Sequence, residues 1–124
     1  MVDRFDVYLV NLDAEPSNNA KNTRPCVVVS PNEMNHNIQN VIIAPLSSVG
    51  TNYPTRIPVN FLNNERAIVL DQIRTVDNIR LVKKIGEIDK NERDGILKCL
   101  AELFAPSRLR NSPAPLLPRP SLIN

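Results

Sequence analysis

Short apolar runs separated by turn-forming residues recur along most of the chain, and they constrain its fold more than any other feature. The run from Phe5 to Leu12 alternates and is largely apolar on both sides, which indicates a nearly buried strand. The β-branched runs Cys26–Ser30 and Val41–Leu46 are typical of central strands. Regularly spaced short strands predict a closed or half-closed antiparallel barrel of the mainly β class. The shorter strands are expected at residues 55–59, 67–70, 73–76 and 83–88.

A single helix is expected after the last strand, beginning at Asp89 and ending near Ala105. Asp89 and Glu92 have the spacing of a capping box, in which two side chains satisfy backbone N–H groups of the first turn. Gly95 weakens such a helix by up to about 1 kcal/mol relative to Ala, so we expect the helix to depend on packing against the sheet. Its apolar face at helical spacing comprises Ile96, Leu97, Leu100, Leu103 and Phe104.

Polar loops and a proline-rich tail complete the chain. Residues 13–23 read DAEPSNNAKNT, an exposed loop long enough to suggest a function, and residues 31–40 and 47–54 also read as loops. Residues 106–124 hold five of the eleven prolines and are expected to be extended or disordered. We therefore assign a barrel domain to residues 1–105 and a basic tail to residues 106–124.

The charges are divided unevenly between these two parts. A length of 124 residues corresponds to about one domain. Residues 1–105 hold 12 Lys and Arg and 13 Asp and Glu, a net charge of −1, whereas the tail adds only Arg108, Arg110 and Arg119. A generally basic coat is therefore excluded for the folded part, and any contact with nucleic acid there requires a local group of cations.

The chain shows no sign of a membrane segment, a leader or a disulfide. No apolar stretch approaches the ~20 residues of a membrane-spanning helix, and the first residues carry mixed charges instead of an apolar secretory segment. We expect a cytoplasmic protein without membrane contact. Cys26 and Cys99 lie 73 positions apart without a CxxC motif, so we interpret both as reduced thiols in the core.

The familiar catalytic signatures are absent. The sequence has no phosphate-binding or dinucleotide-binding glycine loop, no HExxH and no GxSxG. The single histidine, His36, is better interpreted as a solvated turn residue than as a general base. No metal site is expected from one histidine and scattered carboxylates, and no cofactor is expected.

Polar residues at the ends of the expected strands are the remaining candidates. Arg24 stands where the long loop meets a strand, and there it would either grip a phosphate at the barrel mouth or form a surface ion pair. Ser47 and Ser48 are phosphate-binding hydroxyls or simple turn residues. In the polar stretch DQIRT, Asp71 and Arg74 most simply form an internal salt bridge. From this chemistry alone the sequence predicts only a small β-barrel with polar loops.

Read together, five segments resemble the MazF/PemK family of toxin endoribonucleases. The block VLDQIRTVDNIRLVKKIG at residues 69–86 is the most distinctive, and an Arg-Pro pair followed by a valine run supports it. The match keeps the family order over about residues 4–104. The other segments are RFDVYLVNLD (4–13), TRPCVVVSPNEMN (23–35), VIIAPLSS (41–48) and YPTRIPV (53–59).

The resemblance implies a dimeric SH3-like barrel that cuts single-stranded RNA at short sequences without metal. The reaction is attack of a ribose 2′-OH on the adjacent phosphorus, which leaves a 2′,3′-cyclic phosphate and a 5′-OH. It requires removal of the 2′-OH proton, protonation of the leaving oxygen and stabilisation of a dianionic phosphorane.

The resemblance also assigns roles to residues. Arg24 matches the family's catalytic arginine, and Ser47 matches a position usually held by a threonine that binds the scissile phosphate. Asp71 matches an aspartate that takes the base role in some relatives. Because a free guanidinium gives up its proton only far above neutral pH, Arg24 suits charge stabilisation better than proton transfer. The expected RNA-binding residues are Asn18, Asn19, Lys21, Thr23, Ser48, Gln72 and Arg74.

Departures from the family pattern leave an alternative open. Ser17 replaces a glycine and Asn19 replaces a glutamate of the first loop. The alternative is a catalytically degenerate member that only binds an antitoxin and takes part in transcriptional repression. A gyrase poison on the same fold receives little support from these residues. The implied partners are single-stranded RNA, a cognate antitoxin with an acidic disordered segment, operator DNA through the antitoxin complex only, and a second copy of the chain.

Overall fold

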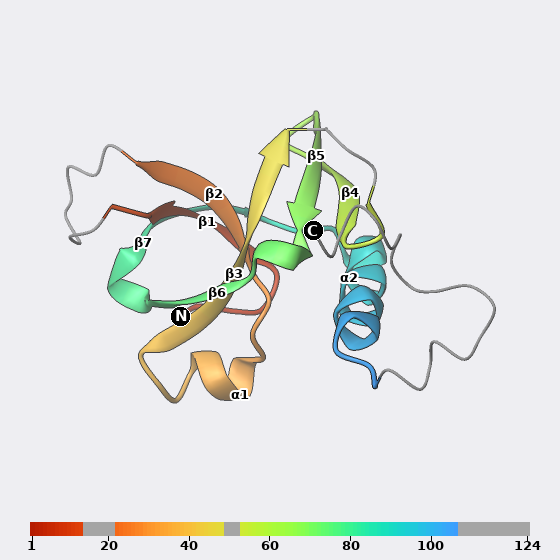
Figure 1. Ribbon diagram of the computed structural model, residues 1–124. Coiled ribbons are helices and arrows are strands. Elements are labelled where there is room, and N and C mark those ends of the chain that lie inside the picture. The colour runs from red at the N-terminus through yellow and green to blue at the C-terminus, as the bar shows by residue number, and fades with distance from the viewer. Residues whose placement is uncertain (14–21, 49–52, 107–124) are drawn as a thin grey trace.

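One curved antiparallel sheet of seven strands carries the fold, and a C-terminal helix packs beside it (Figure 1). The computed structural model describes residues 1–13, 22–48 and 53–106. The helices are the short α1 (Asn32–Asn35) and the longer α2 (Lys90–Leu103), and the 3-10 turns are η1 (Leu70–Gln72) and η2 (Asn78–Arg80). The strands are β1 (Asp6–Asn11), β2 (Thr23–Val28), β3 (Asn40–Ser48), β4 (Arg56–Phe61), β5 (Asn64–Val69), β6 (Arg74–Asp77) and β7 (Leu81–Glu87).

The long strand β3 joins two halves of the sheet. The strand order is β4-β5-β3-β2-β1-β7, and β6 also pairs with β3. Residues 40–43 of β3 pair with β6, whereas residues 46–48 pair with β5. As a result β1, β2, β3, β6 and β7 curl into a ring, and the β4–β5 hairpin lies on the side of α2 (Figure 1). The expected mainly β antiparallel architecture with a packing helix is confirmed.

Two apolar cores lie on opposite faces of the curled strands, because side chains alternate along a strand. The inner core, inside the ring, contains Cys26 and Val28 of β2, whereas Val27 between them belongs to the outer core beneath α2. Both cysteines are free and buried, as the sequence predicts. The inner core comprises Val10, Cys26, Val28, Val41, Ile43 and Val76. The outer core includes Val7, Val27, Leu46, Phe61, Ile68, Leu70, Ile96 and Cys99.

Helix α2 forms where the sequence predicts it, but two details differ. Ile96 and Cys99 are its buried residues, while Phe104 at the C-cap is 70% exposed and lies outside the packed face. The predicted capping box is wrong, since the Asp89 side chain makes no capping hydrogen bond. Burial raises the pKa of the Glu92 carboxyl, and a backbone hydrogen bond from Asn60 opposes the rise. Glu92 thus lies beside Asn60 of β4.

Strand boundaries shift by a few residues, and one predicted loop contains a helix. Strand β2 begins at Thr23 and not at Cys26, because Arg24 and Thr23 pair with Val10 and Asn11 of β1. The segment expected to be only turns contains α1. Its Asn35 is buried, where the side chain donates to the Ser30 carbonyl at 2.9 Å.

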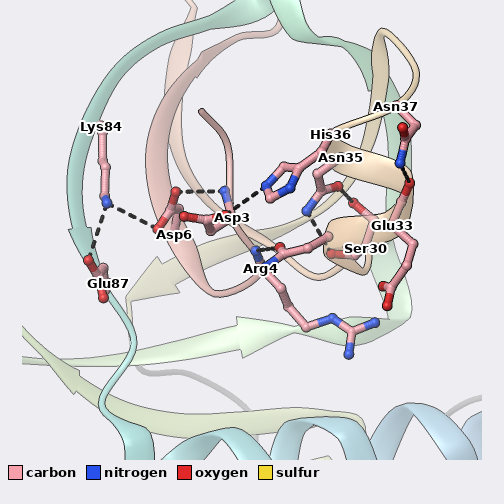
Figure 2. Close-up of polar contacts among 11 residues, drawn as sticks. Asp3, Arg4, Asp6, Ser30, Glu33, Asn35, His36, Asn37, Lys84 and Glu87 are labelled. Carbon is pink, nitrogen blue, oxygen red and sulfur yellow. Dashed lines mark hydrogen bonds and ion pairs between the residues drawn. The ribbon is translucent and has the colours of Figure 1, made fainter.

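Polar contacts hold the N-terminal residues to the ring (Figure 2). The buried Asp6 carboxylate accepts from the backbone N–H of Asp3 at 2.9 Å and forms an ion pair with Lys84 at 3.1 Å. Hydrogen bonds to Asp6 and Glu87 raise the pKa of Lys84. His36 follows α1, and its Nε2 lies 2.8 Å from Oδ1 of Asp3. His36 is therefore an exposed turn residue, as predicted, that also contacts the N-terminal segment.

Two glycines provide a matched stability test. A Cβ at Gly86 of β7 would lie 2.8 Å from Cε1 and Cζ of Phe61, whereas a Cβ at Gly95 of α2 would meet nothing within 4 Å. We expect Gly86→Ala to lower the free energy of unfolding by about 1–3 kcal/mol through overpacking. We expect Gly95→Ala to raise it by up to about 1 kcal/mol through helix propensity. Urea unfolding of both variants measures this, and equal effects of the two would contradict the packing at Phe61.

Candidate functional site

Arg24 lies at the start of β2 and Ser47 at the end of β3. The ladder between these strands pairs Val28 with Ile43, Val27 with Ala44 and Cys26 with Pro45. This ladder ends at Cys26 and Pro45, and residues 46–48 of β3 pair with β5 instead. Because side chains alternate along a strand, Arg24 shares the face of Cys26 and Ser47 shares the face of Ile43, at the rim of the inner core. The two predicted residues therefore share a face of the sheet, but the described β2–β3 ladder does not pair them.

Arg74 joins this face from the third strand. It pairs with Ile43 of β3, whose side chain belongs to the inner core. Burial raises the pKa of the Cys26 thiol to about 11, and the positive charge of Arg74 opposes the rise. The guanidinium of Arg74 therefore acts electrostatically on a thiol that lies two residues from Arg24 along β2. Cys26 itself is a protonated core thiol at neutral pH and not a nucleophile.

The two guanidinium groups at this rim are not neutralised within the described part of the chain. Arg24 and Arg74 are exposed, and neither forms an ion pair or a side-chain hydrogen bond with another described residue. Other arginines are engaged, since Arg56 pairs with Asp71 and Arg93 pairs with Glu87. Two cations on one face produce a local positive potential although residues 1–105 carry a net charge of −1.

The remaining predicted contact residues are spread over other surfaces. Ser48 pairs with Arg66 of β5 and, by alternation, points to the face opposite Ser47. Ser47 Oγ lies 3.2 Å from the Ser48 carbonyl oxygen, to which it donates. Thr23 pairs with Asn11 and likewise faces away from Arg24. Gln72 is exposed in η1. Asn18, Asn19 and Lys21, together with Ser17, lie outside the described residues.

Asp71 has a different set of partners from those that the sequence suggests. Its Oδ1 accepts a hydrogen bond from Thr55 Oγ1 at 2.9 Å and lies 3.4 Å from Nε of Arg56. The predicted salt bridge between Asp71 and Arg74 is wrong, because η1 separates β5 from β6 and Asp71 contacts the start of β4. Its charge also contributes to the raised pKa of Cys99 in α2, mainly a result of burial. Asp71 thus lies beside the outer core, whereas Arg24 and Ser47 lie on the inner face.

A pocket on the other face of the same strand ends was not evident from the sequence. Its volume is about 210 Å³. No sequence pattern signals it, because its residues come from separate strands and the β4–β5 turn, and only the curvature of the sheet gathers them. The lining residues are Leu9, Pro25, Leu46, Phe61, Leu62, Asn64, Arg66 and Ile85.

Within residues 1–13, 22–48 and 53–106, no three His, Cys, Asp or Glu side chains come together in a way that could hold a metal ion. None of the helices there is long and apolar enough to cross a membrane.

The family follows from comparison with known proteins. The family model described as PemK-like, MazF-like toxin of type II toxin-antitoxin system matches residues 3–104. The chain belongs to the PemK/MazF family. A curated relative, endoribonuclease MazF of Staphylococcus epidermidis, is 32% identical over 99 residues, which cover 74% of this chain and 82% of the relative. Membership in this family of toxin endoribonucleases is thus shown by sequence.

Solved structures of the PemK/MazF family share the fold. A mycobacterial endoribonuclease in complex with its cognate antitoxin superposes with a TM-score of 0.67 at 22% identity, over 82% of this chain and 92% of that one. MazF from Deinococcus radiodurans superposes with a TM-score of 0.67 at 19% identity, over 82% and 94% of the two chains. A MazE–MazF structure from the same organism gives a TM-score of 0.66 at 19% identity, over 82% and 93%. At these identities the likeness concerns the fold.

Proposed function

We propose that this protein is the toxin of a type II toxin–antitoxin system and cleaves single-stranded RNA at short specific sequences without a metal ion. The products are a 2′,3′-cyclic phosphate and a 5′-OH. The observation that carries the proposal is that Arg24 and Arg74 are exposed on the inner face of the sheet and have no ion-pair partner among the described residues. An anion is the ligand that these two cations favour, and a phosphodiester supplies one at every nucleotide.

The chemistry of these groups suits a phosphorane. Attack of the 2′-OH on phosphorus adds negative charge to the non-bridging oxygens, and donors aimed at that charge lower the barrier. We assign charge stabilisation to Arg24, whose planar guanidinium donates two parallel hydrogen bonds to a phosphate. The Ser47 hydroxyl supplies a further donor, as a threonine would. Arg74 is assigned to a neighbouring phosphate of the RNA.

Partners follow from the same family membership. The antitoxin-bound relatives support a cognate antitoxin for this chain as well. We propose that an acidic, disordered segment of this antitoxin neutralises Arg24 and Arg74, and that operator DNA is bound only through the antitoxin complex. A homodimer in the cytoplasm is the proposed active form, and light scattering of the purified protein measures its mass.

RNA cleavage in the presence of EDTA tests the proposed function. The purified protein is incubated with a mixture of single-stranded RNAs, and the new ends are sequenced. The ends are also treated with a phosphatase, which removes a phosphomonoester but leaves a cyclic phosphate intact. We expect cuts at a short common sequence with cyclic phosphate ends. A matched substrate with a 2′-deoxyribose at the cleavage position should stay intact, because it lacks the nucleophile. Absence of cuts at high protein concentration, or cutting of the deoxy substrate, would contradict the proposal.

The alternative of a degenerate member rests on Ser17 and Asn19, which replace a glycine and a glutamate of the family loop. Such a protein would bind an antitoxin and leave RNA intact. Expression in bacteria separates the two functions. If expression of the wild-type protein arrests growth and Arg24→Met relieves the arrest at an equal level of folded protein, the alternative of a degenerate member is excluded.

Asp71→Asn tests whether this carboxylate acts as the general base. The variant keeps an acceptor for Thr55 Oγ1 but loses the charge that faces Arg56. From these contacts we expect a loss of about 1 kcal/mol or less in the free energy of unfolding and a change of less than about threefold in the cleavage rate. The base assignment predicts instead a fall of about 10²–10⁴-fold and a changed pH–rate profile. Rate measurements across pH 5–9 distinguish the two outcomes.

A further inference from the structure

Arg80 holds the end of β1 through its backbone. Its Nη1 donates to the carbonyl oxygen of Asn11 at 3.1 Å and also to the carbonyl oxygen of Asp13. Arg80 is the last residue of η2, and this turn is itself well anchored. Asp77 caps η2 by accepting from the backbone N–H of Ile79 at 3.0 Å. The backbone N–H of Asn78 donates to the Gln39 carbonyl at 2.7 Å.

The end of β1 that Arg80 holds is the strand neighbour of Arg24. Val10 pairs with Arg24, Asn11 pairs with Thr23, and the backbone N–H of Leu12 donates to the Asn22 carbonyl at 2.9 Å. The side chain of Asn11 is buried, and its Oδ1 accepts from the backbone N–H of Asp13 at 2.8 Å. A change in the path of residues 11–13 therefore displaces the first residues of β2.

This connection matters because Arg24 has few contacts of its own. Its side chain forms no hydrogen bond or ion pair with another described residue. Pairing with β1 therefore determines the position of the Arg24 backbone, from which the guanidinium extends. Strand ends without side-chain anchors fray readily. An error of about 1 Å in a catalytic group can reduce a rate by about 10²-fold.

We propose that Arg80 is a positioning residue that sets the backbone of Arg24 for phosphate binding. The inference rests on the proposed function. Both N–H groups of Nη1 point at backbone carbonyls, so this end of the guanidinium supports the chain and does not contact RNA. A lysine would retain part of the arrangement, because its ammonium also donates more than one hydrogen bond. A methionine retains similar length and no donor.

Kinetics of four variants test the proposal: Arg80→Met, Arg80→Lys, Arg24→Met and the double variant Arg80→Met/Arg24→Met. We expect Arg80→Met to lower kcat by about 10- to 100-fold and to change KM by less than about twofold. The logarithm of kcat for Arg80→Lys should lie at least about a third of the way from the value for Arg80→Met to the value for the wild type. In single-turnover reactions with excess protein, Arg80→Met should add no further loss to Arg24→Met, since the effect passes through Arg24. Arg93→Met is the matched control, because Arg93 Nε also donates to a backbone carbonyl, that of Ile88 at 2.9 Å.

Several outcomes would overturn the proposal. A rise in KM with a weaker salt dependence and unchanged kcat would make Arg80 an RNA contact. A full additional loss in the Arg24→Met background would make its effect independent of Arg24. If Arg93→Met lowered kcat as much as Arg80→Met does, the effect of Arg80→Met would reflect a general loss of stability and not the positioning of Arg24.

A readout without RNA separates this proposal from the proposed function. Amide hydrogen exchange is measured on the full chain for Leu12 and Arg24, at the paired ends of β1 and β2. We expect faster exchange at both amides in Arg80→Met and little change in Arg93→Met. If the wild-type protein does not cleave RNA, the proposed function fails while this result still stands. If exchange at Leu12 and Arg24 is unchanged, the positioning role fails even where RNA is cleaved.

Discussion

Arg24→Met is expected to reduce the rate of RNA cleavage by about 10²–10³-fold, which is the usual effect of removing one donor that stabilises a developing oxyanion. The free energy of unfolding should change by less than about 0.5 kcal/mol, because the side chain is exposed and has no partner among the described residues. Single-turnover cleavage of RNA and urea unfolding of the same preparation measure the two quantities.

Two further variants make the result specific to the guanidinium. Arg24→Lys keeps the charge but loses the two parallel hydrogen bonds, so we expect an intermediate rate. Arg74→Met should mainly raise KM and reduce the salt dependence of binding by about one counterion. If Arg24→Met cleaved RNA at more than about a tenth of the wild-type rate while folded, the rim would not be the catalytic centre.

Ile96→Ala is expected to lower the free energy of unfolding by about 2–5 kcal/mol, the range for truncating a large buried aliphatic side chain. Ile96 is fully buried in the outer core beside Cys99 and is the main apolar anchor of α2. The helix depends on this contact more than most, since Gly95 next to it lowers the intrinsic helix stability. Urea unfolding followed by circular dichroism measures the change.

Phe104→Ala is the matched control for that variant. Phe104 belongs to the same predicted helical face but is 70% exposed at the C-cap of α2. Its removal should change the free energy of unfolding by less than about 0.5 kcal/mol. A loss for Ile96→Ala below about 1 kcal/mol, or equal losses for the two variants, would show that α2 is not held through this face.

Much of the fold could be predicted because the signals are local. The β-branched runs at residues 26–30 and 41–46 correspond to β2 and β3, and the periodic segment after Asp89 corresponds to α2. Strand boundaries were less accurate, since pairing with β1 and not propensity starts β2 at Thr23. The predicted capping box is absent, since the Asp89 side chain makes no capping hydrogen bond.

The candidate site was predicted less completely. The sequence names Arg24, Ser47 and Arg74, and alternation along β2, β3 and β6 gives the three side chains the same face, although the described ladder does not pair Arg24 with Ser47. The partner of Asp71 was wrong, because Arg56 is distant from it in sequence and near only after β4 pairs with β5. No sequence signal points to Arg80, since its partners are backbone carbonyls 69 and 67 residues away.

The sequence by itself determined the order and type of the longer strands and of α2, the two buried thiols and the family, because hydrophobic period, turn residues and motif spacing are written along the chain. Only the tertiary structure decided which charges meet. The face on which Arg24 and Arg74 stand unneutralised, the ion pair of Asp71 with Arg56 and the hold of Arg80 on β1 all depend on register and curvature. Such contacts join residues that are distant along the chain, and no local pattern of residue types specifies them.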